Sequence, residues 1–68
     1  MSDEDLVLDL ETRRRLRHDL STQLTIVAGL AAVLAGDREI SLADRREFAV
    51  RIQDAAAEIR QLIDSALE

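Results

Sequence analysis

The residues best suited to chemistry surround His18, the only histidine in the chain. It lies in the segment RRRLRHDLSTQLTIVAGLAAVL, residues 13–34, between an arginine cluster and a long apolar run. Its neighbours, adjacent in sequence or one helical turn away, are Arg14, Arg15, Asp19, Ser21 and Thr22. A neutral imidazole is a nucleophile near neutral pH, and guanidinium groups attract anionic phosphoryl groups. The spacing therefore fits a phosphoryl-accepting site; the alternative is an ordinary surface histidine among solvated charges.

The elements that must position these residues are predicted to be two helices. Ser2 with Asp5 and Ser41 with Asp44 each fit a capping box, which marks a helix start. Gly36 follows the first apolar pattern as a natural C′ residue. The predicted elements are a first helix over about 3–35, a loop over 36–41 and a second helix over about 42–67. The fold class is therefore all-α, an antiparallel two-helix hairpin.

Apolar residues recur on both predicted helices in steps of three and four. On the first helix, one stripe comprises Leu20, Leu24, Val27, Ala31 and Leu34, and a second comprises Ile26, Leu30 and Val33. Near His18, the residues expected to point inward are Leu16, Leu20 and Leu24. On the second helix, the face comprises Leu42, Ala49, Ile52, Ala56, Ile59, Ile63 and Ala66, widened by Phe48, Ala55 and Leu62. The opposite, solvated side comprises Glu47, Arg51, Asp54, Glu58 and Gln61.

Two stripes on one helix require more than one neighbouring helix. A hairpin of 68 residues has a marginal core and covers only one stripe per helix. We therefore expect a homodimer that forms a four-helix bundle. The alternative is a monomeric hairpin that docks on an unrelated partner.

The composition excludes several kinds of chemistry. The chain has no cysteine, no lysine and two isolated glycines, so thiolate metal sites, Schiff bases and phosphate-cradling loops are excluded. We expect no metal site and no cofactor. A net charge of −5 argues against nucleic acid as a partner. The apolar run at 24–35 is shorter than the roughly 20 residues that span a bilayer, and the acidic start is unlike a signal peptide, so we expect a cytoplasmic protein with no membrane partner.

The order of residues around His18 resembles the H-box of the dimerisation and histidine-phosphotransfer (DHp, or HisKA-like) domain of bacterial sensor histidine kinases. In that family, His-[Asp/Glu]-Leu is followed by a polar pair, Pro-Leu-Thr and an apolar stretch, often with a glycine. Here the matching residues are His18, Asp19, Leu20, Ser21, Thr22, Gln23, Leu24 and Thr25, with Gly29 in the apolar stretch. The second helix, RIQDAAAEIRQLIDSALE, is similar to the family's second bundle helix. The resemblance covers about residues 13–68.

The resemblance implies a role for each matching residue. His18 is the phosphorylated residue, and Asp19 orients or deprotonates its imidazole. Thr22 completes a D-x-x-T pattern that resembles the family's phosphatase motif, in which the side chain positions a water. Arg14, Arg15 and Ser21 are expected to support the phosphoryl group on the separate ground of their helical spacing from His18. The surface that docks a response-regulator receiver domain comprises Thr25, Ile26 and Gly29, with early residues of the second helix.

The sequence departs from the family in two respects. Gln23 replaces the usual proline, which bends the first helix in the family. The chain also contains no N-box and no glycine-rich ATP lid, so it is not a self-sufficient kinase.

The predicted function is therefore histidine phosphotransfer and dimerisation in a two-component system or phosphorelay. A receiver domain would supply the aspartate and the Mg²⁺, and a histidine kinase or its ATP-binding domain is the other expected partner. One alternative is a non-catalytic dimeric helical protein that sequesters or inhibits a kinase or receiver. Another is an excised fragment of a sensor histidine kinase.

Overall fold

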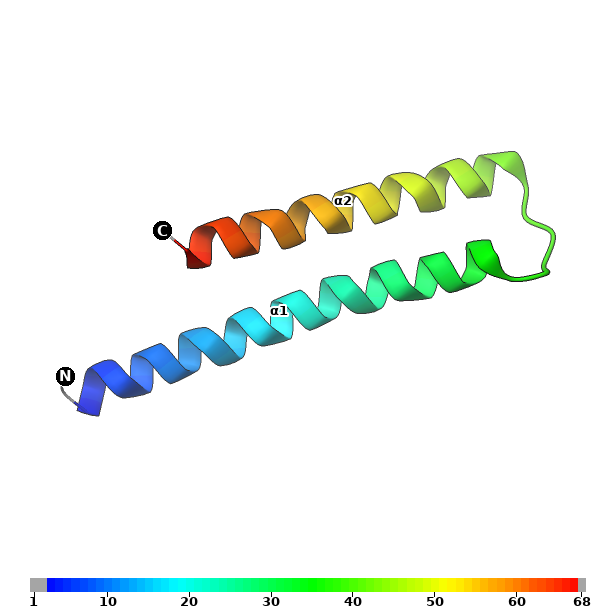
Figure 1. The fold of residues 1–68 in the computed structure, drawn as a ribbon. Helices are drawn as coiled ribbons and strands as arrows, with labels where there is room; N and C mark the ends of the chain where they lie inside the picture. The colour runs from blue at the N-terminus through cyan, green and yellow to red at the C-terminus, as the bar shows by residue number, and fades with distance from the viewer. Residues whose placement is uncertain (1–2, 68) are drawn as a thin grey trace.

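The computed structural model of the chain is an antiparallel hairpin of two long helices (Figure 1). Helix α1 spans Asp3–Ala35 and helix α2 spans Leu42–Ala66. The structure describes the backbone of residues 3–67 and the side chains of residues 9–67. The all-α hairpin is confirmed, and the helix bounds agree with the predicted ones to within a residue. The capping box predicted at Ser2 lies outside the described residues.

Hydrogen bonds next to the loop explain where α1 ends and where α2 begins. Ser41 is the N-cap of α2, and its hydroxyl accepts a hydrogen bond from the backbone N–H of Asp44 at 3.1 Å. Helix α1 ends at Ala35, immediately before Gly36. The N–H of Gly36 donates to the carbonyl of Val33 at 3.3 Å, and its φ is not positive. The helix therefore ends in a tightened last turn, without the left-handed residue that often follows a helix.

The seam between the helices is narrow and holds little buried surface. On α1, its half-buried residues are Leu16, Asp19, Leu20, Gln23, Ile26, Val27, Leu30 and Leu34. On α2, they are Phe48, Ile52, Ile59 and Leu62, with Ala55 buried between them. Ala55, at 4% exposure, is the single buried residue among the side chains that the structure describes. The hairpin alone thus lacks the core that a stable domain of this size needs.

The seam differs in register from the predicted stripes. Leu24, which we expected to point inward, is 56% exposed, and the polar Gln23 takes the place facing α2. On α2, Ile52 and Ile59 of the predicted face lie in the seam, together with the three residues predicted to widen it, while Ile63 is exposed. The physical reason is rotation: one residue turns a helix by about 100°, so centring the seam on Gln23 moves Leu24 to a flank. The exposure predicted for the polar side of α2, including Glu47 and Gln61, is confirmed.

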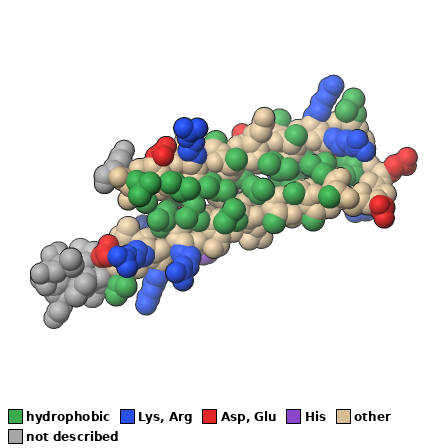
Figure 2. Space-filling model, viewed as in Figure 1, with side chains coloured by type: hydrophobic (Ala, Val, Ile, Leu, Met, Phe, Trp, Pro, Cys, Tyr) green, Lys and Arg blue, Asp and Glu red, His purple; other side chains and the backbone are tan. Residues whose placement is uncertain are grey.

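The two flanks of the seam differ in chemistry. Thr22 and Leu24 lie on opposite flanks of Gln23, just as Asp54 and Ala56 lie on opposite flanks of Ala55. We call the Leu24 and Ala56 flank the apolar face; its exposed residues include Leu24, Ala28, Ala31 and Ala35 of α1 and Leu42, Ala49, Ala56 and Ile63 of α2. The Thr22 and Asp54 flank is the polar face. Figure 2 shows hydrophobic side chains running along both helices, with charged groups gathered mainly towards the ends.

One segment of α1 also satisfies a membrane-span criterion. By length and composition alone, Asp9–Ala35 is apolar enough to cross a membrane, a test that core helices of soluble proteins and signal sequences also pass. In the hairpin, the same segment provides the α1 side of the seam. The cytoplasmic location expected from the sequence stays a prediction.

Candidate functional site

His18 lies in the middle of α1 with its side chain exposed. Residues spaced three or four apart lie on the same side of a helix. The stripe that contains His18 comprises Arg15, His18, Thr22, Thr25 and Gly29. All five residues are exposed. The helix thus brings most of the predicted site residues together on one solvent-facing stripe. Arg14 and Ser21 border His18 on its other side and belong to the stripe that continues to Leu24.

The side chain of Thr22 is already engaged with the backbone of the histidine. Its Oγ1 donates a hydrogen bond to the carbonyl oxygen of His18 at 3.0 Å. Threonine commonly bonds the carbonyl four residues earlier in this way. The contact fixes the Thr22 hydroxyl one turn after the imidazole, and its oxygen keeps lone pairs that can accept a hydrogen bond from water.

Asp19 faces the seam, away from the centre of the His18 stripe. It is half-buried and borders a hollow of about 200 Å³ at the open end of the hairpin. The hollow is lined by Thr12, Arg15, Leu16, Asp19, Leu62, Ser65 and Ala66. Successive helical residues do not face each other, so Asp19 is a neighbour of the imidazole in sequence while its carboxylate faces α2. Its predicted role on the imidazole stays a prediction.

The arginines before His18 divide into two groups. Arg15 joins Asp19 at the seam hollow. Arg13, Arg14 and Arg17 surround Leu10 in a second hollow of about 270 Å³, which we call the arginine patch. Within this patch Arg13 pairs with Asp9 at 3.3 Å, an exposed contact that contributes little to stability. Positive charge therefore lies on both sides of the helix within a turn of His18.

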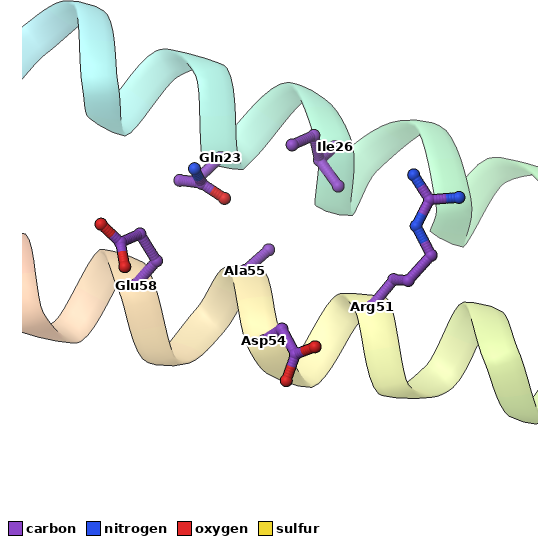
Figure 3. Close-up of a pocket in the computed structure, with 6 residues that line it drawn as sticks. All are labelled: Gln23, Ile26, Arg51, Asp54, Ala55 and Glu58. Atoms are coloured by element: carbon purple, nitrogen blue, oxygen red, sulfur yellow. The ribbon is translucent and has the colours of Figure 1, made fainter.

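A polar groove lies beside the stripe, on the polar face. It has a volume of about 370 Å³ and is lined by Gln23, Ile26, Arg51, Asp54, Ala55 and Glu58 (Figure 3). Gln23 and Glu58 extend towards each other from the two helices, and Arg51 reaches from α2 towards α1. Helix α1 is above α2 in Figure 3 and below it in Figure 1, with the loop end on the same side, so Figure 3 views the opposite face of the hairpin.

The groove links the predicted docking residues to a part of α2 that the sequence did not single out. Ile26, predicted to contact a receiver, is half-buried and forms the α1 wall with Gln23. Arg51, Asp54 and Glu58 were predicted only as solvated residues and form the α2 wall. No local sequence signal marks them, because their place depends on how the two helices are rotated against each other.

Gly29 is open to solvent on the same stripe. A Cβ built at this position meets no atom within 4 Å. The hairpin itself therefore has no steric requirement for glycine here, which leaves room for a partner's close approach to the backbone. Thr25 is likewise exposed beside it.

Comparisons of the chain with family models, curated proteins and solved structures find no match. The fold and the site thus define the protein by its geometry, as an all-α helical hairpin that exposes a histidine stripe beside a polar groove.

Proposed function

We propose that this protein is a histidine phosphotransfer module that accepts a phosphoryl group on His18 and exchanges it with an aspartate of a response-regulator receiver. The observation that best supports this function is the exposure of His18 on a helical stripe that also contains Arg15 and Thr22. A partner can approach this stripe without disturbing the seam. The H-box order of the same residues, from His18 to Thr25, supports the proposal independently.

The transfer requires only a nucleophile and correct positioning. The lone pair of an imidazole nitrogen of His18 attacks the phosphorus of the receiver's phospho-aspartate. The nitrogen–phosphorus bond forms as the phosphorus–oxygen bond breaks, and the aspartate leaves as a carboxylate. The ring proton is lost to solvent, and the reverse step returns the phosphoryl group to an aspartate. In-line positioning and charge neutralisation supply the rate, so the hairpin needs no metal ion of its own.

Two further features complete the proposed function. The polar groove and Gly29 receive the receiver domain, because they adjoin the His18 stripe on one face. The apolar face pairs with a second copy to form a four-helix bundle, because the hairpin leaves Leu24, Leu42 and Ile63 exposed at 56%, 64% and 43%. The two partners would therefore use opposite faces of the hairpin.

The direct test is a phosphotransfer assay with His18→Gln as the comparison. Purified wild-type protein and the variant are mixed with phosphorylated receivers and with isolated kinase ATP-binding domains. We expect an acid-labile, base-stable label on the wild type alone, and unchanged dimerisation of the variant because residue 18 is exposed. Label on His18→Gln would refute the assignment of the phosphoryl acceptor.

The same assay tests the role of Thr22. If Thr22 positions a water, the wild type accelerates phosphate loss from a phosphorylated receiver and Thr22→Val does not. Thr22→Val keeps the shape of the side chain and removes its hydroxyl, so receiver binding should be retained. Equal phosphate loss with both proteins would exclude a role for the hydroxyl.

A further inference from the structure

The hollow at the open end of the hairpin, which we call the open-end hollow, has a size suited to a small ligand. It lies where the last turns of α2 meet the first half of α1 (Figure 1). Its volume is about 200 Å³. A cavity of about 150 Å³ holds one benzene molecule, and sites for drug-sized ligands begin at about 300 Å³. The open-end hollow therefore has room for a molecule with one small apolar group and is too small for a nucleotide.

The lining of the open-end hollow combines an apolar surface with two opposite charges. Leu16 of α1 and Leu62 of α2 are half-buried, and Ala66 extends the apolar surface that they form. Arg15 and Asp19 border the same hollow from α1. A ligand in the hollow thus meets apolar side chains, one guanidinium group and one carboxylate.

The two charged groups do not neutralise each other. Arg15 and Asp19 are one helical turn apart, yet they form no ion pair among the side chains that the structure describes. Asp9 and Arg13 have the same spacing in the opposite order, and they pair at 3.3 Å. On a helix the better arrangement places the acidic residue four positions before the basic one. Arg15 and Asp19 have the less favourable order, so both remain available to a ligand.

We propose that the open-end hollow binds a free α-amino acid with a branched apolar side chain, such as leucine. The carboxylate of the amino acid pairs with the guanidinium group of Arg15, and its ammonium group pairs with the carboxylate of Asp19. Its side chain packs against the apolar surface. A simple carboxylic acid would leave Asp19 without a partner, and a simple amine would leave Arg15 without one. A zwitterion is therefore the small ligand that satisfies both groups.

The bound amino acid also regulates phosphotransfer, a consequence that rests on the proposed function. In that function Arg15 attracts the phosphoryl group on His18. A carboxylate held on Arg15 neutralises this attraction one helical turn from the imidazole. The amino acid therefore lowers the extent of phosphorylation of His18, and phosphorylation weakens amino-acid binding by the same factor.

Titration of the protein alone with leucine tests the binding. Nuclear magnetic resonance signals report on each residue, and we expect saturable shifts at Arg15, Asp19 and Leu62 with none at Phe48 near the loop. Two analogues each lack one charged group: isocaproate has no ammonium group, and isoamylamine has no carboxylate. Each should bind at least about tenfold more weakly than leucine, because each loses one hydrogen-bonded charge pair. Equal binding of leucine and either analogue, or no saturation by leucine, would overturn the proposal.

A variant that fills the open-end hollow tests its position while keeping both charged groups. Ala66→Leu adds an apolar side chain to the lining, and leucine favours the helix nearly as well as alanine does. Ala57→Leu makes the same change at an exposed position of α2 outside the lining. We expect Ala66→Leu to lose leucine binding and Ala57→Leu to retain it. Retained binding in Ala66→Leu would overturn the assignment of the site.

Phosphotransfer to His18, measured with and without leucine, tests the coupling. Leucine should reduce the label on the wild type and leave the label on Ala66→Leu unchanged. An equal effect of leucine on both proteins would overturn the coupling. The titration needs neither a receiver nor a label, so it decides the binding even if His18 accepts no phosphoryl group.

Discussion

The two faces of this hairpin are formed by the same two helices, but their exposed side chains differ in chemistry. On the polar face, charged side chains border a groove, and His18 lies on the exposed stripe beside it. On the apolar face, alanines, leucines and Ile63 remain exposed where a soluble monomer would place polar groups. The seam between the helices is the same for both faces, so the two faces differ only in the side chains that flank it. In the proposed function, the polar face exchanges with a changing partner and the apolar face has a permanent neighbour.

The largest effect is expected from a charge placed on the apolar face. Leu24→Glu should weaken dimerisation by roughly a hundredfold or more, because a carboxylate would be buried against apolar side chains of the second copy. Analytical ultracentrifugation across a concentration series measures the change.

A matched control separates the face from the residue type. Val50 is 52% exposed, close to the 56% of Leu24, and lies on the outer side of α2 away from the apolar face. Val50→Glu should leave the dimer intact. Equal weakening by both variants would show that dimerisation does not depend on the apolar face.

The next effect concerns the seam that both faces share. Ile59→Ala removes a half-buried side chain packed against α1, so the free energy of unfolding should fall by about 2 kcal/mol. Val50→Ala, at an exposed position, should change it by less than about 0.5 kcal/mol. Urea unfolding followed by circular dichroism at fixed protein concentration checks both values. A similar loss at the two positions would contradict the observed seam.

The sequence predicts those features that depend on interactions between residues close together in the chain. The end of α1 and the start of α2 follow from Gly36 and Ser41, because those effects operate within one turn. Leu16 and Leu20 were expected to point inward beside His18; both are half-buried, and His18 between them is exposed. Counting apolar residues placed Leu24 in the seam and left out Gln23, since α1 has two apolar stripes and counting alone does not place the seam between them.

The groove could not be predicted, for a related reason. Whether Glu58 lies near Gln23 or points to open solvent depends on the rotation of α2 against α1. Packing along the whole seam sets that rotation, and no single residue determines it. The sequence identified Ile26 as a contact residue but contained no signal for the opposite wall.

Gln23 offers a smaller and sharper test of that seam. It occupies a half-buried position between the two helices, where Gln23→Leu would replace an amide with an apolar side chain. We expect the free energy of unfolding to rise by about 1 kcal/mol, because more apolar area is removed from water. The same change removes the amide from the α1 wall of the polar groove, so receiver binding should weaken while stability increases. Thermal unfolding and a receiver titration on the same samples measure the two effects. A fall in stability would show that Gln23 does not lie in the seam.

A stability change of similar size is expected at Gly29, where helix stability and receiver docking make opposite demands. The added methyl group of Gly29→Ala meets nothing within 4 Å in the hairpin, and alanine favours the helix over glycine by about 1 kcal/mol. The variant should therefore unfold at a slightly higher temperature and dimerise normally. If a receiver backbone approaches the polar face at this point, the same methyl group obstructs it, and phosphotransfer to His18 slows while stability rises. Ala28→Gly, one residue earlier on the apolar flank, is the reciprocal control: it should lower stability by a similar amount and leave transfer unchanged. Faster or unaltered transfer in Gly29→Ala would place the docking surface elsewhere on the hairpin.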